Sequence, residues 1–506
     1  MVAQRIGLIA GAAALALAIV APTPAGMSRE ALIVAGLVVL MAAWWMTEAL
    51  PLTATALMPF LVLPFAGVMD AKATASAYYS PILFLLLGGA FIALAIERTG
   101  LHKRLALAIL NALHERGGQT GLLLAFMIAA AILSMLISNT STALIMMPMA
   151  LAVLAGGEVT SASSSAALGR TGEVSPASSS AAVGQTGNTS PASSSAAVGQ
   201  TEGLAGALPM GIAFAASIGG LGTLVGSPTN AIAVGLLDTM IGAKISFAEW
   251  TLYGLPIVIV GVPIAAFLIA RVQRVAAHPF DVEAARTAIV DDRPMGTPER
   301  RLILVVGVTF LAWMTRLLVA PYLPDGSWTD GTIAILASLA LFLLPDGTGR
   351  PLLVWKEADR APWGVIMMFG GGLALAAGMG ASGLAEWLGN ALLPLEAWPL
   401  FLVALAVVAM VVLITEFASN VATASAIIPV VAALVVALGV DPVLLAMPAA
   451  LAASWGFMLP AGTGPNAIAW ATGRIRIERM VKAGLLFDLV GIFLIVLVVW
   501  GVGALV

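Results

Sequence analysis

Cysteine is absent from the sequence, which excludes disulfide bonds, thiolate chemistry and cysteine-ligated metals. Charged residues make up only 10% of the 506 residues, whereas a soluble domain carries roughly 25%. Basic and acidic residues number 23 and 26, so the net charge of -3 gives no indication of nucleic-acid binding. The three histidines stand near expected loops, and we expect them to be solvated: His102, His114 and His278.

The motifs of known hydrolases are also missing. There is no HExxH, no GxSxG, no pair of aspartates in a GxGD context and no histidine near a membrane serine. We therefore expect that the protein is not an enzyme. An intramembrane hydrolase is the alternative from another class, and it would require a catalytic pair that the sequence does not show.

Long hydrophobic runs are abundant instead. Hydrophobic residues make up 60% of the chain and its mean hydropathy is +1.04, which predicts an all-α polytopic protein of the cell (inner) membrane. The run after Arg5 resembles a signal peptide, but because the remaining chain is itself membrane-embedded we interpret it as the first spanning helix. About eleven transmembrane helices are expected, near residues 6–21, 31–50, 52–69, 80–98, 207–238, 251–270, 301–320, 330–345, 362–380, 443–471 and 483–504.

The positions of Lys and Arg predict the orientation of these spans, because basic loops stay in the cytoplasm. Counting spans places all basic groups and the N-terminus on the cytoplasmic side, with the C-terminus opposite. The basic groups are Lys103, Arg104 and Arg116; Arg271, Arg274, Arg286, Arg293, Arg300 and Arg301; Arg350, Lys356 and Arg360; and Arg474, Arg476, Arg479 and Lys482.

Two short polar strings interrupt the apolar runs at matching places. Ser138-Asn139-Thr140 and Ser419-Asn420-Val421 are offset by 281 residues (419 minus 138). At the same offset three further pairs match: Ser134 with Thr415, Thr142 with Thr423, and Pro148 with Pro429. One string alone is equally compatible with a helix cap, but two matched copies indicate an internal duplication, as in secondary transporters. We expect each string at the tip of a re-entrant helical hairpin, and the two hairpins enter from opposite faces, so the repeat is inverted.

A span interrupted by small and turn-forming residues follows each hairpin. Residues 226–230 (GSPTN) match residues 462–466 (GTGPN) at an offset of 236 (462 minus 226). Gly and Pro break a helix inside the membrane, which leaves free carbonyl and N–H groups side by side. Carbonyl, hydroxyl and amide oxygens suit sodium, while N–H groups at half-helix starts suit an anion. For a single copy, a kink that permits tight helix packing would be the simpler interpretation.

The remaining polar features are expected to be structural. Residues 156–204 form an imperfect 15-residue tandem of Ser, Ala, Gly and Pro, which predicts a flexible low-complexity insert. Residues 276–299 are expected to form an exposed connector. The acids at membrane depth, Glu48, Glu416 and Asp488, are functional candidates by position. We favour a structural role in which they fix helix ends by accepting backbone hydrogen bonds.

These motifs resemble those of the divalent anion/sodium symporter family, whose members carry dicarboxylates, citrate or sulfate. The resemblance covers nearly the whole chain except the insert. It rests on WWMTEALPLTATALMP from Trp44, SPILFLLLGGAFIALAIERTGLHKR from Ser80, the Ser-Asn-Thr string, GGLGTLVGSPTN from Gly219, WGVIMMFGGGLALAAGMGASGLAEWLG from Trp363, TEFASN from Thr415 and SWGFMLPAGTGPNAI from Ser454.

The resemblance implies an inverted-repeat elevator fold with about eleven transmembrane helices and two re-entrant helical hairpins. It also implies a homodimer, in contact with membrane lipid, in which a transport domain moves against a static scaffold. The scaffold would comprise residues 1–117 and 300–393, and the transport domain would comprise 118–275 and 394–506. Residues 276–299 would form a cytoplasmic connector between the first transport segment and the second scaffold segment.

The family pattern also implies the ligands. The substrate set comprises Ser138, Asn139, Thr140, Ser227, Ser419, Asn420, Val421 and Thr463. Two or more sodium ions are expected, one among Ser134, Ser138, Asn139 and Gly226 and another among Thr415, Ala418, Asn420 and Gly462. Val421 stands where family members often have threonine, so one hydroxyl facing the substrate is absent. The expected function is sodium-coupled symport of C4-dicarboxylates such as succinate, malate and fumarate; the alternatives are sulfate or citrate as cargo, or sodium-independent dicarboxylate exchange.

Overall fold

The structure is a computed structural model that describes residues 2–112, 118–168, 202–278, 280–283 and 294–505. Within these ranges the chain is all-helical, and no strand is present beyond one isolated bridge between Pro345 and Pro351. Nine described helices are long and apolar enough to cross a membrane, or ten when one bent pair is counted as a single span. The all-α membrane class is confirmed, while the expected number of about eleven spans stays a prediction.

The first half of the chain alternates long helices with short ones. In order they are α1 (Val2–Val20), α2 (Arg29–Thr47), α3 (Leu52–Thr55), α4 (Met58–Phe65), α5 (Ala71–Ala77), α6 (Pro81–Thr99), α7 (Leu101–Ala112), α8 (Gly118–Ser134), α9 (Asn139–Leu168), α10 (Leu204–Gly219), α11 (Pro228–Ile241) and α12 (Phe247–Val272). The expected span at 52–69 is thus divided between two short helices, α3 and α4.

The second half repeats much of this order. Its elements are η2 (Val275–Ala277), α14 (Thr297–Met314), α15 (Arg316–Val319), η3 (Ala320–Tyr322), α16 (Asp330–Leu343), α17 (Trp355–Ala358), α18 (Trp363–Ala381), α19 (Leu384–Leu392), η4 (Leu393–Ala397), α20 (Leu400–Phe417), α21 (Asn420–Leu438), α22 (Pro442–Ala452), α23 (Gly464–Ala471) and α24 (Ile477–Gly503). The series α6 to α12 and α18 to α24 therefore match element by element.

Helix starts in both halves follow from local sequence. A hydroxyl or carboxylate residue precedes a proline at several starts, as at Ser80, Ser227 and Asp441, where the side chain accepts a hydrogen bond from the first turn. Proline fits there because the first N–H groups of a helix have no partner within it. The breaks that interrupt the spans are thus specified by short local signals.

The outer surface of the bundle is apolar. Large hydrophobic side chains are exposed along the long helices, among them Leu304 and Leu311 on α14 and Phe493 and Leu497 on α24, each more than half exposed. A water-soluble protein rarely exposes so much contiguous apolar surface, whereas lipid accepts it. This exterior supports the multi-pass membrane class.

Small residues bring the helices around the breaks close together. A Cβ atom on Gly219 of α10 would lie 2.3 Å from the carbonyl oxygen of Ala131 on α8, and one on Gly254 of α12 would lie 2.1 Å from that of Leu221. Real Cβ contacts are never so short, so only glycine permits these approaches. The packing holds α10 and the residues after it tightly against α8 and α12.

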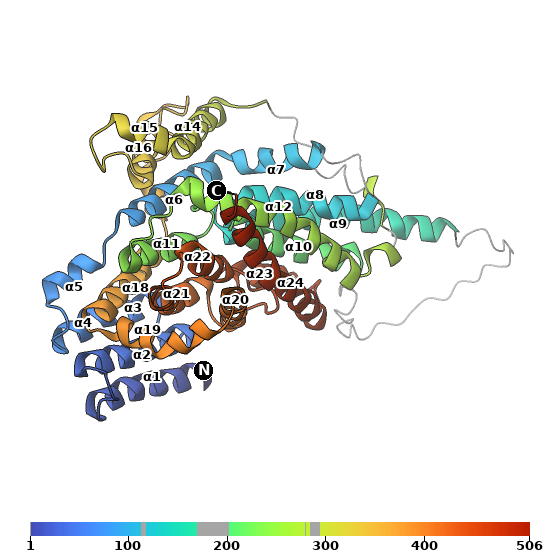
Figure 1. The fold of residues 1–506 in the computed structure, drawn as a ribbon. Helices are drawn as coiled ribbons and strands as arrows, with labels where there is room; N and C mark the ends of the chain where they lie inside the picture. Colours follow the sequence, from blue (N-terminus) through green and yellow to red (C-terminus); the bar gives the residue numbers. More distant parts are fainter. Residues whose placement is uncertain (1, 113–117, 169–201, 279, 284–293, 506) are drawn as a thin grey trace, which may run out of the picture.

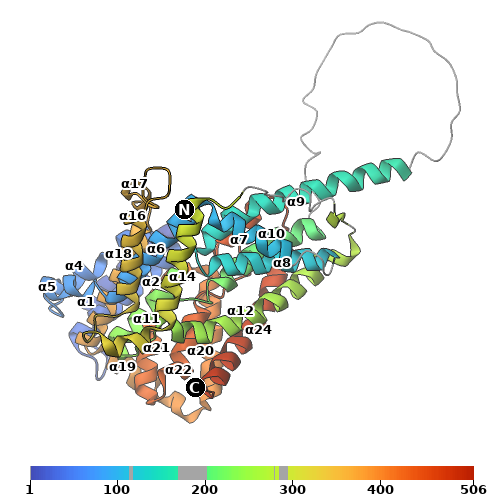
Figure 2. The ribbon, with the colours of Figure 1, turned by 90° about the horizontal axis from the view of Figure 1, so that it is seen from above.

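Two sets of helices occupy different sides of the molecule. Figures 1 and 2 show α1 to α5 and α18 on one side and α8 to α10 with α12 on the other. Across this division α11 packs against both α18 and α21, and α9 packs against α23. Segments from opposite halves of the sequence are therefore neighbours at the centre of the molecule.

Two expectations are corrected by the fold. Helix α9 runs to Leu168, so residues 156–168, the start of the expected flexible insert at 156–204, are helical as a continuation of the apolar part of α9. Residues 169–201 of the insert and 284–293 of the connector lie outside the described residues. His102 is 3% exposed instead of solvated, because it lies on the inner face of α7, where its Nδ1 is 3.0 Å from the carbonyl oxygen of Ile96.

Candidate functional site

The first polar string lies in the break between α8 and α9. Ser138 precedes α9 and its Oγ accepts a hydrogen bond of 3.2 Å from the N–H of Ser141. Ser134, the last residue of α8, places its Oγ 2.7 Å from the side-chain amide of Asn139. The Oγ1 of Thr223 donates to the carbonyl of Met135 at 2.6 Å, which ties the break to the interrupted span that follows α10. The string is therefore fixed by bonds within its own segment and by one from the following span.

The second string repeats this arrangement between α20 and α21. Ser419 caps α21, and its Oγ accepts a hydrogen bond of 3.2 Å from Ala422. The hydroxyl of Thr415 lies 2.9 Å from Oδ1 of Asn420 and 2.8 Å from the carbonyl oxygen of Ala453. The match of Ser134 with Thr415 and of Asn139 with Asn420, predicted from the offset of 281, thus appears in space as two equivalent pairs.

The interrupted spans are also built alike. Asn230, which is fully buried, donates from its amide to the carbonyls of Gly220 at 2.7 Å and Thr223 at 2.9 Å. Asn466, equally buried, donates to the carbonyl of Leu459 at 3.1 Å. Each asparagine therefore satisfies carbonyls freed by the broken helix, as buried polar groups require. The sequence placed both in matching motifs, but nothing local showed that their role is to hold the unwound backbone.

The two breaks and the two interrupted spans surround one cavity of about 510 Å³. All eight residues of the predicted substrate set line it: Ser138, Asn139, Thr140, Ser227, Ser419, Asn420, Val421 and Thr463. Part of its wall comes from α6, which the sequence did not connect with the site, since no polar motif marks the inner face of that helix. The structure thus brings together residues from both halves of the chain.

Four helices begin at this cavity. The first residues of α9, α11, α21 and α23 line it, and the residue before each is a serine or threonine. Each of these hydroxyls accepts a hydrogen bond from its own helix, at 3.2 Å for Ser138, Ser419 and Thr463 and 3.4 Å for Ser227. Helix N-termini carry partial positive charge and free N–H groups, so four of them converging on one cavity favour an anion there.

The polar strings themselves carry no formal positive charge. Among the described residues that line the cavity, the ionisable ones are Glu97, near the end of α6, and Arg360, between α17 and α18. An anion at the polar strings would therefore be bound by hydroxyls, amides and N–H groups. Close packing also positions these groups: a Cβ on Gly464 would lie 2.5 Å from Oγ1 of Thr140, and one on Gly220 would lie 2.2 Å from Asn139.

The predicted sodium ligands fall into two groups. Asn139, Asn420 and Gly462 line the cavity, whereas Ser134, Gly226, Thr415 and Ala418 lie behind it and are buried. One terminal atom of the Asn139 amide lies 2.7 Å from Oγ of Ser134 and 3.2 Å from the carbonyl oxygens of Ala216 and Gly226. Ser138 also lines the cavity. Its Oγ donates to Oγ of Ser141 at 2.9 Å and accepts from the N–H of Ser141 at 3.2 Å, which leaves one lone pair for a cation. The sequence missed Ala216 and Ala453, whose backbone carbonyls carry no sequence signal.

The donor chemistry of these groups fits an alkali cation and not a transition metal. Hydroxyl, amide and carbonyl oxygens are the ligands that hard cations take. In the described part of the chain, no group of three or more His, Cys, Asp or Glu side chains is placed to hold a metal ion. The residues at both breaks therefore fit sodium as a transported ion.

Of the acids at membrane depth, Glu416 accepts backbone hydrogen bonds as we expected, but from the unwound segment between α22 and α23 instead of a helix end. It is 1% exposed, and its carboxylate accepts hydrogen bonds from the backbone N–H groups of Phe457, Met458 and Leu459, the last two at 3.0 and 3.1 Å. Asp488 is buried beside it. For Glu48 the expectation that it accepts backbone hydrogen bonds was wrong. Its side chain is exposed and has no hydrogen-bond partner among the described residues. Helix α2 ends there because Glu48 takes a left-handed backbone conformation.

Taken together, the fold and the cavity define a helical membrane transporter with a central polar site between two pairs of broken helices. The comparisons with known proteins agree. Residues 3–505 match the family model described as sodium:sulfate symporter transmembrane region, so the chain belongs to this family. The predicted resemblance to the divalent anion/sodium symporters is confirmed, and so is the expectation of a transporter that is not an enzyme.

Two curated relatives cover nearly the full chain. The sodium-dependent dicarboxylate transporter SdcS of Staphylococcus saprophyticus is 37% identical over 510 residues, which cover 99% of this chain and 91% of that protein. SdcS of Staphylococcus aureus strain bovine RF122 is 36% identical over 509 residues, with 98% and 91% covered. Among solved structures, the YdaH transporter of Alcanivorax borkumensis has a similar fold, with a TM-score of 0.51 at 15% identity over 92% of this chain and 98% of that one.

Proposed function

We propose that the protein is a sodium-coupled symporter of C4-dicarboxylates such as succinate, malate and fumarate. The observation that carries this proposal is the convergence of four hydroxyl-capped helix N-termini on one cavity, with a cluster of cation-type oxygens behind each polar string. The full-length relatives are named as sodium-dependent dicarboxylate transporters, which supports the same cargo and the same coupling ion.

The Asn139 amide explains how an ion and an anion can depend on one another. With its nitrogen toward Ser134, Ala216 and Gly226, the amide donates hydrogen bonds to all three oxygens. With its oxygen turned the same way, four oxygens converge and only a cation between them makes the arrangement favourable. Because Asn139 also lines the cavity, sodium orients the amide N–H groups toward the substrate. A ligand couples to another only through such differential affinity.

We further propose an elevator motion of an inverted repeat. In this proposal residues 118–275 and 394–506 form the transport domain, residues 1–117 and 300–393 form the scaffold, residues 276–299 connect them, and the N-terminus is cytoplasmic. The matching order of α6 to α12 and α18 to α24 and the position of the cavity between the halves support it. A homodimer in the cell membrane is part of the same proposal.

The test is uptake of labelled succinate, malate, citrate and sulfate by the purified protein in proteoliposomes, with and without an inward sodium gradient. We expect succinate uptake that requires sodium. Two sodium ions per dianion carry no net charge, so uptake that also responds to membrane potential would show that at least three sodium ions move with each succinate. Equal uptake in sodium and choline buffers would contradict symport and favour dicarboxylate exchange. Preferred uptake of sulfate or citrate would instead change the cargo while leaving the coupling intact.

Val421 provides a test of the substrate contact itself. It lines the cavity at the place that matches Thr140, where it offers only methyl groups. Val421→Thr adds one hydroxyl at nearly unchanged volume, so selectivity between succinate and the more polar citrate should shift by about 0.5–1.5 kcal/mol, the value of one hydrogen bond. Competition against labelled succinate measures the shift. An unchanged ranking of inhibitors would show that residue 421 does not contact the cargo.

A further inference from the structure

The cavity extends from the polar strings along one face of α6 to a pair of charged residues. The residues of α6 that line the cavity recur every four positions along one face of the helix: Leu85, Gly89, Ala93 and Glu97. Twelve residues of α-helix span about 18 Å, so Glu97 stands that far along α6 from the start of the lining. The side chains of Glu97 and Arg360 are 41% and 58% exposed, which marks this end of the cavity as its mouth.

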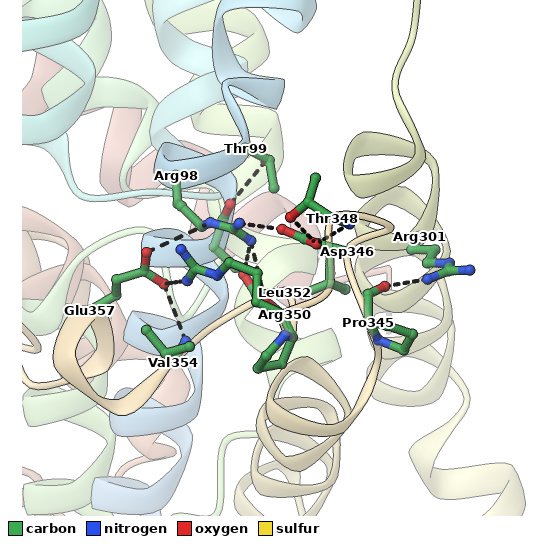
Figure 3. A network of polar contacts seen from close by, with 12 residues as sticks. Arg98, Thr99, Arg301, Pro345, Asp346, Thr348, Arg350, Leu352, Val354 and Glu357 are labelled. Carbon is green, nitrogen blue, oxygen red and sulfur yellow. Dashed lines mark hydrogen bonds and ion pairs between the residues drawn. The ribbon is translucent and has the colours of Figure 1, made fainter.

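A rigid frame of ion pairs holds the chain beside this mouth. Arg98, the residue after Glu97, contacts Asp346 and donates to the carbonyl of Leu352 at 2.6 Å, while Arg350 pairs with Glu357 at 2.6 Å (Figure 3). Hydrogen bonds from Thr348, and then the guanidinium of Arg98, hold the pKa of Asp346 below its usual range. This network joins the end of α6 to the segment that leads through α17 to Arg360.

Arg360 differs from these arginines because its hydrogen-bond donors are not used. Within the described part of the chain its guanidinium has one charged neighbour, Glu97, with Nη2 and Oε1 3.7 Å apart, which is longer than a hydrogen bond. Such an exposed ion pair contributes little and is easily opened. Arg98, in contrast, is engaged by Asp346 and by the carbonyl of Leu352, and Arg350 hydrogen-bonds to Glu357; neither of the two lines the cavity.

We propose that Arg360 is an outer binding site for the dicarboxylate at the mouth of the cavity, with Glu97 as the group that the substrate displaces. This inference rests on the proposed function. A planar guanidinium takes a carboxylate through two parallel hydrogen bonds, and a cation at the mouth of an otherwise uncharged cavity raises the local concentration of a dianion. Glu97 competes for the same guanidinium, which keeps the outer site weak enough for the anion to move on to the polar strings or to leave.

The test measures association of succinate with the detergent-solubilised full chain by stopped-flow tryptophan fluorescence. Sodium is held constant and choline chloride sets the ionic strength at about 10 or 150 mM, where the Debye length is about 30 or 8 Å. For Arg360→Gln we expect association about tenfold slower at low ionic strength, the smaller end of electrostatic steering, and a lost dependence on salt. Glu97→Gln should associate faster than the wild type, since the competitor is gone.

Lys356→Gln is the matched control, because it removes a positive charge from the same segment at an exposed residue that does not line the cavity. It should slow association at 10 mM ionic strength less than Arg360→Gln does, because it changes only the long-range field, and it should match the wild type at 150 mM. Wild-type kinetics in Arg360→Gln, or equal slowing in Lys356→Gln, would overturn the outer site alone. Absence of sodium-dependent succinate binding by the wild type would overturn the proposed function and this site with it.

Discussion

Asn139→Ala and Asn420→Ala are each expected to abolish sodium-driven uptake while leaving folded protein in the membrane. Asn139 lies within hydrogen-bond distance of Ser134, Ala216 and Gly226, and Asn420 lies 2.9 Å from Thr415. Both asparagines also line the cavity, so in the proposed function each amide would serve an ion on one side and the anion on the other. Losing two hydrogen bonds to charged partners, each about 1.5–3 kcal/mol, lowers uptake by about 100-fold or more.

Initial uptake of labelled succinate in proteoliposomes measures this effect, with the amount of reconstituted protein determined in parallel. Asn390→Ala is the control, because Asn390 is exposed on α19 and does not line the cavity. It should retain wild-type uptake. If either Asn139→Ala or Asn420→Ala transported normally, the polar strings would not be the binding site, and the cavity between them would need another occupant.

The polar strings and the interrupted spans could be predicted from the sequence because the signals for them are local and occur twice. Each polar string, each Gly-Pro break and each capping hydroxyl lies within a few residues of the backbone it controls, and a second copy stands at a fixed offset. The offset of 281 residues alone assigns Ser134 and Thr415 to matching places, and each lies beside the asparagine of its own string. Local helix signals also predicted most of the helices around them.

The parts that could not be predicted depend on segments far apart in the chain. Arg360 contacts Glu97, and Arg98 contacts Asp346. The two residues of each pair come from opposite halves of the sequence, and no local pattern predicts either contact. The backbone carbonyls of Ala216 and Ala453 lie beside Asn139 and Thr415, and because the contact is made by the backbone, the side chains give no indication of it. Helix α9 extends into the predicted linker as far as Leu168, although residues 156–168 contain more serine and glycine than alanine, so their composition did not predict it.

Two glutamates show most directly that contacts between distant segments could not be predicted from the sequence. Glu48 and Glu416 both stand in apolar surroundings in the sequence, and the same structural role was expected of each. Glu416 is 1% exposed and accepts hydrogen bonds from three backbone N–H groups, whereas Glu48 is exposed and has no side-chain partner among the described residues. Only the fold, which brings residues 457–459 back against α20, distinguishes them. The difference predicts opposite outcomes for the same substitution.

Glu416→Ala is expected to destabilise the protein strongly and to stop transport. It leaves the N–H groups of buried Phe457 and half-buried Met458 and Leu459 without their acceptor, and each donor left unsatisfied away from water costs about 1–3 kcal/mol. The segment they belong to leads directly to Gly462 and Thr463 at the cavity, so the second ion cluster loses its geometry as well. Thermal unfolding in detergent, followed by tryptophan fluorescence, should shift downward by about 5–10 °C.

Glu48→Ala is the matched control for this prediction. Its side chain has no hydrogen bond to lose among the described residues, so both the melting temperature and succinate uptake should stay at wild-type values. Glu416→Gln should fall between the two, because one amide oxygen still accepts while the amide nitrogen faces backbone donors. Equal melting of Glu416→Ala and the wild type would show that the carboxylate does not hold residues 457–459. The second interrupted span would then owe its shape to Asn466 and to the glycine and proline residues of its own sequence.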